Sequence, residues 1–364
     1  MISRYLKKGA FSAANLLGAD ALFRRVNKEK LLVVMYHGVS ASAPSPIWTQ
    51  LPVAVFRRQL EFLRRNYRVL ALSEVVDAVR GNRSLPERAA LITFDDGLRN
   101  NLTVAFPVLE ELAIPATVFL TVDAIGTREI LWVDELYLLL CEAAACGVAP
   151  EVFEGAATRH LRAGRIWESY QVLVEALKRS GSAPRNEAMN RLRNLLPAGL
   201  CDRSHDFALL DWDEVRALQR SKLVEFGVHT ATHRILSELQ PHEWERELVA
   251  PKKTLEQELG VEAATFCFPN GRPLLDFRSE HLEFLRNAGY ACAFTTENAL
   301  FDLRGGDPLS IGRIPAGNDS TSEADYFRLN TSGALGFLKT ALKRKAPLTG
   351  GAGVGPYWKR ETHG

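Results

Sequence analysis

The chain has 364 residues, and its 46% hydrophobic content can fill the core of one large α/β domain or two ordinary ones. Its 45 Lys and Arg residues against 43 Asp and Glu give a formal charge of +2, which excludes a strong overall field for nucleic acid. Basic residues gather at the ends: residues 1–30 hold seven against two acids, and residues 334–364 hold six against one.

The cysteines indicate a reducing compartment. They are five in number and form no Cys-x-x-Cys pair: Cys141, Cys146, Cys201, Cys267 and Cys292. Such spacing is typical of buried thiols, not of a disulfide scaffold or a thiolate zinc site. No apolar run approaches the roughly 18 to 20 residues of a membrane span, and the N-terminal apolar stretch lacks the features of a signal peptide. We therefore expect a cytoplasmic protein.

Apolar runs of strand length, rich in β-branched and aromatic residues, recur along the chain. They span residues 31–37, 67–72, 90–96, 116–122, 223–229, 264–269, 291–296 and 309–314. Segments with apolar residues at helical spacing follow most of them, as at residues 52–66. The alternation predicts a parallel sheet covered by helices, either a β/α barrel or an open doubly wound sheet.

A stretch of about residues 131–210 interrupts this alternation, because it looks helical or irregular and contains no core-type strand. An insertion of this size after a core strand is expected over one end of the sheet. It either walls a substrate cleft or forms a helical subdomain that only stabilises the fold, and the sequence leaves both interpretations open.

The first polar motif, TFDDG, ends a predicted strand with Asp95, Asp96 and Gly97. Adjacent side chains of a strand point to opposite faces, so the two carboxylates can share one site only where the backbone turns, which Gly97 favours. The alternative is a helix cap followed by a first-turn acid.

The second motif, FGVHTATH, places His229 and His233 four residues apart directly after a predicted strand. Both imidazoles lie on one face if the turn is helical, a spacing that many histidine-ligated metal sites use. The alternative is a pair of structural histidines. The third motif, FCFPNGRP, breaks its strand at Pro269, Asn270 and Gly271 and is only a turn when taken alone.

Together the three motifs predict a metal site. The carboxyl ends of parallel strands gather at one face, so all three turns are expected to line one mouth. Two imidazoles and one carboxylate form a three-ligand site for a divalent cation, and a second carboxylate can deprotonate bound water. His37 ends the first predicted strand and is expected in the same mouth.

The sequences ITFDDG, HTATH and FCFPNG, in this order, resemble the successive signatures of the polysaccharide deacetylases, the NodB-homology domain of carbohydrate esterase family 4. The segments VVMYHGVS, IPATVFL and LWVDEL are similar to bacterial members that act on exopolysaccharide and N-acetylglucosamine polymers. The resemblance covers about residues 31–317.

This resemblance implies a distorted (β/α) barrel of seven or eight mostly parallel strands with a helical insertion. It also implies a divalent cation, zinc first, with nickel, cobalt or iron as alternatives. Asp96, His229 and His233 match the metal ligands of the family, and Asp95 matches its catalytic base.

Further residues are candidates to support the reaction. Thr230 occupies the Ser/Thr position after the first histidine and is expected to support the metal ligands. The turn from Phe268 through Pro269 to Asn270 is expected to supply a backbone N–H to the oxyanion of the tetrahedral intermediate.

Two positions depart from the family pattern. Many members carry an arginine in the third motif that orients the base, whereas Cys267 stands here, so Arg272 or Arg313 would have to substitute. Those members also carry a late histidine as general acid, whereas the last predicted strand reads LSIGRIPAGN. His37 is our candidate for the general acid, with a purely structural role as the alternative.

The expected organisation is a basic amphipathic N-terminal helix at 1–30, the deacetylase barrel at 31–317 with its insertion at about 131–210, and a basic extension at 318–364. Basic amphipathic helices lie on anionic membranes or dock on a barrel with solvated lysines. The first alternative predicts a protein peripheral to the inner membrane that acts on a lipid-linked glycan. The sequence does not indicate an oligomeric state.

The leading hypothesis is a metal-dependent hydrolase that removes acetyl groups from N-acetylated amino sugars of a polysaccharide or glycan intermediate. The same site could attack an O-acetyl ester or a non-sugar amide. A catalytically silent glycan-binding module is the alternative from another class. Cys267 and the absent late histidine favour it, whereas Asp95 and the three metal ligands oppose it.

Overall fold

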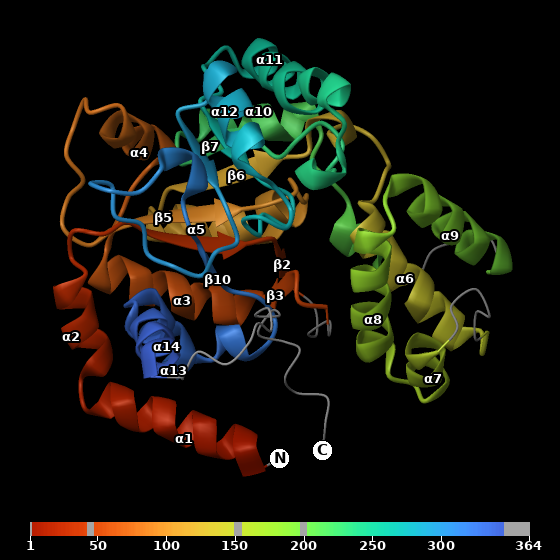
Figure 1. The fold of residues 1–364 in the computed structure, drawn as a ribbon, viewed down its shortest axis with the longest axis horizontal. Coiled ribbons are helices and arrows are strands. Elements are labelled where there is room, and N and C mark those ends of the chain that lie inside the picture. The colour runs from red at the N-terminus through yellow and green to blue at the C-terminus, as the bar shows by residue number, and fades with distance from the viewer. Residues whose placement is uncertain (1, 42–46, 149–154, 197–201, 346–364) are drawn as a thin grey trace.

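The computed structural model describes residues 2–41, 47–148, 155–196 and 202–345 (Figure 1). Its centre is one sheet in which every strand pair is parallel. The strands are β1 (Leu32–Tyr36), β4 (Arg68–Val69), β5 (Ala89–Phe94), β6 (Ala116–Leu120), β7 (Val224–Val228), β8 (Thr265–Cys267), β9 (Cys292–Phe294) and β10 (Ile314–Pro315). Their order is β10-β1-β5-β6-β7-β8-β9, with β4 beside β5.

One segment joins the two edges of this sheet. Ile311 forms a parallel bridge with Phe294 of β9, and Ile314 of β10 pairs with Val34 of β1. The sheet therefore curls into a distorted (β/α) barrel, and the predicted fold class is confirmed.

Helices cover the outside of the barrel (Figure 1). They include α3 (Val53–Asn66), α4 (Leu72–Val79), α5 (Phe106–Leu112), α10 (Trp212–Arg220), α11 (Ala250–Leu259) and α12 (Ser279–Asn287). The helix α3 shows why, since Phe56, Leu60 and Leu63 are buried on one face at helical spacing. All six residues of β5 are buried, as expected for a strand covered on both faces.

The last strand is shorter than its apolar pattern suggests. The pattern covers residues 309–314, but a 3-10 turn at Pro308–Ser310 precedes β10. A side chain at Gly312 would lie 2.8 Å from the carbonyl oxygen of Glu297, because two backbone segments touch there. The parallel pair β2 (Gly38–Ser40) and β3 (Gln50–Pro52) was not predicted, since both strands are only three residues long.

The insertion is helical, as expected, and stands beside the barrel in Figure 1. It contains α6 (Trp132–Ala145), α7 (Ala156–Arg162), α8 (Ile166–Arg179), α9 (Ser182–Leu195) and a 3-10 segment at Asp202–Phe207. Its four helices bury a hydrophobic cluster of their own, to which they contribute Leu136, Leu161, Leu173 and Leu192 respectively. This separate core makes the insertion a packed layer instead of a loose loop.

The N-terminal segment forms two helices, α1 (Ile2–Leu16) and α2 (Ala19–Val26), with Gly18 between them at a φ of +77°. The two helices lie against α13 (Ala324–Thr331), and α2 also contacts α14 (Ala334–Lys345). Residues 346–364, the last part of the predicted C-terminal extension at 318–364, lie outside the described part. Among the described residues, no helix is both long and apolar enough to cross a membrane.

Candidate active site

The three polar motifs follow the carboxyl ends of neighbouring strands. Asp95 and Asp96 follow β5, His229 follows β7, and the turn that contains Asn270 follows β8. In the sheet only β6 stands between β5 and β7, and β8 is next to β7. The parallel direction of all these strands therefore brings the motifs to one mouth.

Strained backbone marks these turns. Asp96, Thr230, His233 and Asn270 have positive φ values of 76°, 62°, 60° and 61°. Non-glycine residues adopt this left-handed region at a cost, and such residues cluster at functional sites. The turn after Asp96 needs a glycine as well, since a Cβ on Gly97 would lie 2.9 Å from Leu120.

Asp96 and the two histidines converge on one point. The Oδ1 atom of Asp96 lies 3.2 Å from Nε2 of His233 and 3.4 Å from Nε2 of His229. Burial opposes ionisation of Asp96, but the two histidines outweigh it and hold the pKa of that carboxyl well below its usual range. Within the described residues Asp96 Oδ1 is buried and accepts no hydrogen bond.

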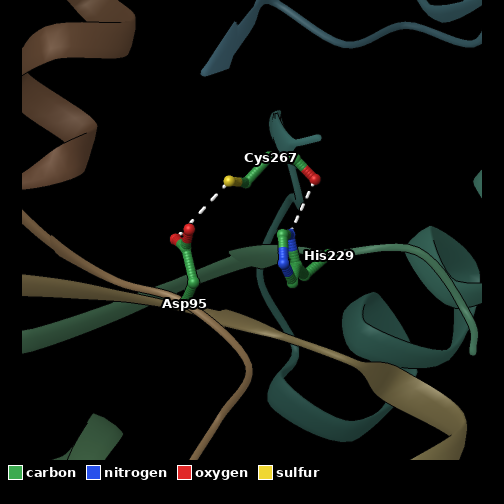
Figure 2. Close-up of side chains that lie close together, drawn as sticks. All are labelled: Asp95, His229 and Cys267. Carbon is green, nitrogen blue, oxygen red and sulfur yellow. Dashed lines mark hydrogen bonds between the residues drawn. The ribbon is translucent and has the colours of Figure 1, made fainter. Parts of the chain in front are cut away.

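This geometry fits a metal ion. Ligands about 2.1 Å from a tetrahedral Zn²⁺ stand about 3.4 Å from one another, close to the two separations here. The Nδ1 atom of His229 lies 2.8 Å from the carbonyl oxygen of Cys267 (Figure 2), so it donates its proton there and leaves Nε2 free to bind a cation. Asp96, His229 and His233 are thus suited to a divalent cation.

Asp95 has a different set of neighbours. Arg313 donates two hydrogen bonds to its carboxylate, at 2.7 and 2.8 Å, and the guanidinium is fully buried. Burial opposes ionisation, but the charge and hydrogen bonds of Arg313 outweigh it and lower the pKa of Asp95. Asp95 is therefore an ionised carboxylate in a fixed orientation, which is what a general base requires.

Cys267 points at the same carboxylate. Its Sγ atom lies 3.5 Å from Oδ1 of Asp95 (Figure 2). Asp95, His229 and Cys267 could also surround a metal ion. This set fits less well, because Arg313 already occupies both oxygens of Asp95 and burial raises the pKa of the Cys267 thiol, which disfavours a thiolate ligand.

His37 lies at the rim of the Asp95 pocket. Its Nε2 atom is 4.0 Å from Asp95 Oδ2, and its ring packs edge-on against Trp48 with 5.2 Å between centroids. Its Nδ1 atom is buried without a hydrogen-bond partner among the described residues. Burial lowers the pKa of His37, and the opposing charges of Asp96 and Asp95 do not compensate for it.

Of the remaining predicted residues, Asn270 and Thr230 lie in the turns of the site, whereas Arg272 does not contact Asp95. In the third motif, the N–H of Phe268 donates to Phe294 at 3.1 Å and Pro269 has no N–H, so the amide of Asn270 is the donor left, with no acceptor among the described residues. Thr230 is fully buried, and its hydroxyl has no partner in the described part of the chain.

Arg272 donates to Asp276 at 2.8 Å, and one of its nitrogens lies 3.8 Å from Glu175 of α8. The structure therefore brings Arg313, and not Arg272, to Asp95. Sequence reasoning missed Trp48, which shapes the surroundings of His37. Trp48 precedes β3 in an irregular segment, and no motif or spacing identifies it.

The chain is similar to known deacetylases in sequence and fold. The family model described as polysaccharide deacetylase matches residues 82–293. Over 109 residues the chain is 30% identical to poly-beta-1,6-N-acetyl-D-glucosamine N-deacetylase of Escherichia coli (strain K12), an alignment that covers 29% of this chain and 16% of that protein. The match thus spans well under half of the relative.

Solved structures share the fold. IcaB from Ammonifex degensii aligns with 84% of this chain and 97% of its own, at a TM-score of 0.54 and 19% identity. The Streptococcus pyogenes deacetylase PplD, solved in complex with acetate, aligns with 81% of this chain and 95% of its own, at a TM-score of 0.52 and 18% identity. With a family match over more than half of its length, this chain belongs to the polysaccharide deacetylase family.

Proposed function

We propose that this protein is a divalent-metal-dependent hydrolase that removes acetyl groups from N-acetylated amino sugars of a polysaccharide or glycan intermediate. The observation that carries the proposal is the pair of adjacent carboxylates: Asp96 faces His229 and His233, while Asp95 is held by Arg313. The name of the Escherichia coli relative makes β-1,6-linked N-acetylglucosamine the first glycan to test.

Asp96, His229 and His233 would hold the cation, with zinc as the first expectation and nickel, cobalt or iron as alternatives. When bound, the cation polarises the acetamide carbonyl and acidifies water. Asp95 would accept the proton of the attacking water, because it is ionised and its carboxylate is fixed by Arg313.

The departing amine needs a proton. His37 is the candidate donor, since its Nε2 lies 4.0 Å from Asp95 and the proton that Asp95 accepts can pass to it. A lowered pKa means that His37 is neutral at pH 7 and can receive that proton before it gives it to the amine. This route requires no second acid at the last strand, where the family's late histidine is missing.

The amide of Asn270 is the donor for the oxygen that becomes negative in the tetrahedral intermediate. Thr230, beside His229 in the chain, is fully buried, and its hydroxyl, which has no partner among the described residues, is available to support the metal ligands. Asn270 and Thr230 both lie in turns with positive φ values, so the turns hold these two residues in place before the substrate binds.

Two variants test the assignment. Asp95→Asn should lower acetate release from N-acetylated glucosamine oligomers by about 10²- to 10⁴-fold, because the general base is lost, while bound metal stays close to one equivalent. His229→Ala should lose the metal as well as the activity. Acetate assays with metal analysis by mass spectrometry measure both quantities, and normal turnover of the Asp95 variant would refute the assignment.

The same assay separates the alternatives. Faster acetate release from O-acetylated sugars or from non-sugar amides would move the proposal to an esterase or another amidase. Metal binding without acetate release from any substrate would support a silent glycan-binding module. The buried Asp95–Arg313 pair favours catalysis, because an ionised carboxylate at a metal mouth has no evident use in a module that only binds glycan.

Contact with an anionic membrane is a proposal that rests on the basic termini, and a cytoplasmic location is a proposal that rests on the cysteine pattern. The helix α1 docks on α13 through Phe11 and Tyr326, but Leu16, Leu17, Leu22 and Val26 are exposed. Sedimentation with anionic liposomes should pellet the full chain more than a chain without residues 1–28. Equal pelleting would contradict membrane contact.

A further inference from the structure

The helical insertion is tied to the mouth of the barrel. At the end of the insertion, the backbone N–H of Leu210 donates to the carbonyl oxygen of Gly97 at 2.9 Å, and the backbone N–H of Arg99 donates to the carbonyl oxygen of Ala208 at 2.7 Å. These bonds attach the insertion directly behind Asp95 and Asp96. An ion pair at 3.3 Å between Arg185 of α9 and Glu238 fixes it to the segment after the two histidines. The insertion therefore has a fixed position next to the site.

One acidic side chain of the insertion, that of Asp134, is buried without a hydrogen-bond partner or counter-ion among the described residues. Asp134 lies in the first turn of α6 and is 1% exposed, yet neither of its carboxylate oxygens has a hydrogen-bond partner among the described residues. Burial raises the pKa of Asp134 well above its usual range, and the negative charge of Asp96 raises it further. The nearby hydroxyl of Thr49 opposes this rise, but it makes no hydrogen bond of normal geometry to Asp134 or to another described residue. The first turn of α6 also lies beside the segment that leads to His37: Ile47 belongs to the hydrophobic cluster of the insertion together with Leu136 of α6, and the adjacent Trp48 packs against His37.

A structural role does not account for this residue. An acid in the first turn of a helix is stabilising when it is solvated or caps an N–H, but Asp134 is buried and caps none. The next residue shows the ordinary arrangement, because Glu135 pairs with Arg193 at 2.6 Å within the insertion. A buried carboxyl without a partner costs stability, and in a native protein such a group needs an explanation, of which a hydrogen bond to a bound ligand is one.

The surroundings of Asp134 are suited to a sugar. Tyr170 of α8 is buried; its ring stacks on Trp167 at 5.2 Å and packs edge-on against Tyr137 of α6 at 5.9 Å between centroids. Lys178 of the same helix is half-buried, and burial lowers its pKa. Aromatic faces and buried polar groups together are typical of carbohydrate sites.

We propose that Asp134 is a substrate-positioning residue, which hydrogen-bonds a hydroxyl or the amide N–H of the acetylated sugar and so holds the acetamide over Asp96 and its histidines. The proposal rests on the deacetylase function proposed above. It assigns the insertion a direct part in substrate binding, beyond its packing on the barrel.

Binding measured without turnover tests this proposal. In an Asp95→Asn background, calorimetric titration with a short β-1,6-linked N-acetylglucosamine oligomer should show affinity lowered about tenfold or more by Asp134→Ala, since a hydrogen bond to a buried carboxyl is lost. Asp134→Asn keeps hydrogen-bonding atoms and should lose less. The control Glu135→Gln, one residue along α6, should bind within about twofold of the parent.

Two further readouts exclude a structural explanation. Asp134→Ala should unfold at or above the melting temperature of the parent, because it removes an unpaired buried carboxyl, and Asp134→Asn should unfold close to it, because one unpaired polar group replaces another. In the Asp95-containing enzyme, Asp134→Ala should lower kcat/KM for the oligomer about tenfold but leave the hydrolysis of 4-nitrophenyl acetate and the metal content unchanged, since a small ester makes no contact with Asp134.

Unchanged oligomer affinity in Asp134→Ala would overturn the inference, as would a lowered melting temperature with equal losses on the oligomer and the small ester. Failure of the proposed function looks different. There, the unmutated protein would release no acetate from any glycan, and the calorimetric comparison of the Asp134 variants would still decide whether Asp134 binds sugar.

Discussion

Asp95 and Asp96 are neighbours in the chain and are both buried, yet their pockets differ in composition. The Asp95 pocket supplies a counter-ion: Arg313 donates one hydrogen bond to each carboxylate oxygen, and the Cys267 thiol lies beside them. The Asp96 pocket is incomplete, because its Oδ1 faces two imidazole nitrogens and accepts no hydrogen bond among the described residues. A carboxylate with its own counter-ion stays ionised in a fixed orientation, as a base must be before it accepts a proton, and one with an unsatisfied oxygen can bind a cation.

The largest effect on this contrast is expected from Arg313→Gln. It leaves Asp95 buried without a counter-charge, and breaking a buried ion pair in this way costs about 3 to 5 kcal/mol of the free energy of unfolding. Denaturant titration at pH 7 measures the loss. Arg313→Lys is the control, since it keeps the charge but not the two parallel hydrogen bonds, and it should lose less.

The same variant has a distinct pH dependence. In the unmutated protein the pKa of Asp95 lies below the 3.8 of the unfolded chain, so the pair stabilises the fold above about pH 4 and this stabilisation is lost as pH falls further. Without Arg313 only burial remains, which raises the pKa. The deficit of Arg313→Gln should therefore be larger at pH 7 than at pH 4, and the acid limb of kcat/KM should move to higher pH. A constant deficit would contradict the pairing.

Metal removal probes the other pocket. Saturating Zn²⁺ at about 100 times its dissociation constant should stabilise the protein by about 2.7 kcal/mol, an effect that a chelator reverses. Asp96→Asn should abolish this metal-dependent shift of the melting temperature, whereas Asp95→Asn should retain it. Loss of the shift in the Asp95 variant alone would assign the metal to the Asp95, His229 and Cys267 cluster instead.

The sequence predicts one part of this site well and another part poorly. The parallel sheet covered by helices and the meeting of Asp96 with His229 and His233 follow from local patterns, because each motif ends a strand and parallel strands end at one face. The patterns alone predict no strand order and leave an open sheet as the alternative to a barrel. The partner of Asp95, in contrast, cannot be predicted from local sequence patterns. Arg272 and Arg313 were equal candidates, and only the closure of the barrel brings β10 beside β1 and sets Arg313 against β5.

Asp134 shows the same limit. An acid in an apolar run signals a helix start as readily as a binding group. Its burial and its lack of a partner depend on how the insertion packs, over distances that no local pattern encodes.

A smaller effect is expected from His37→Gln. If His37 returns a proton to the leaving amine, kcat should fall about 10- to 100-fold, with bound metal and KM nearly unchanged. Steady-state kinetics on the oligomer measures this split. An ester substrate with a leaving group that needs no proton should lose much less, and it serves as the control. An equal loss on both substrates would indicate that His37 only packs against Trp48 and Asp95.

The smallest effect is expected from Cys267→Ala, although Cys267 stands where many family members have an arginine. The thiol makes one long contact to Asp95, at 3.5 Å, whereas Arg313 makes two short ones and supplies the charge. The backbone carbonyl that accepts from His229 is retained in the variant. We therefore expect kcat/KM within about threefold of the parent and a stability loss of about 1 kcal/mol, from a small cavity. A loss as large as that of Arg313→Gln would mean that the thiol orients the base and that the Asp95 pocket depends on β8 as much as on β10.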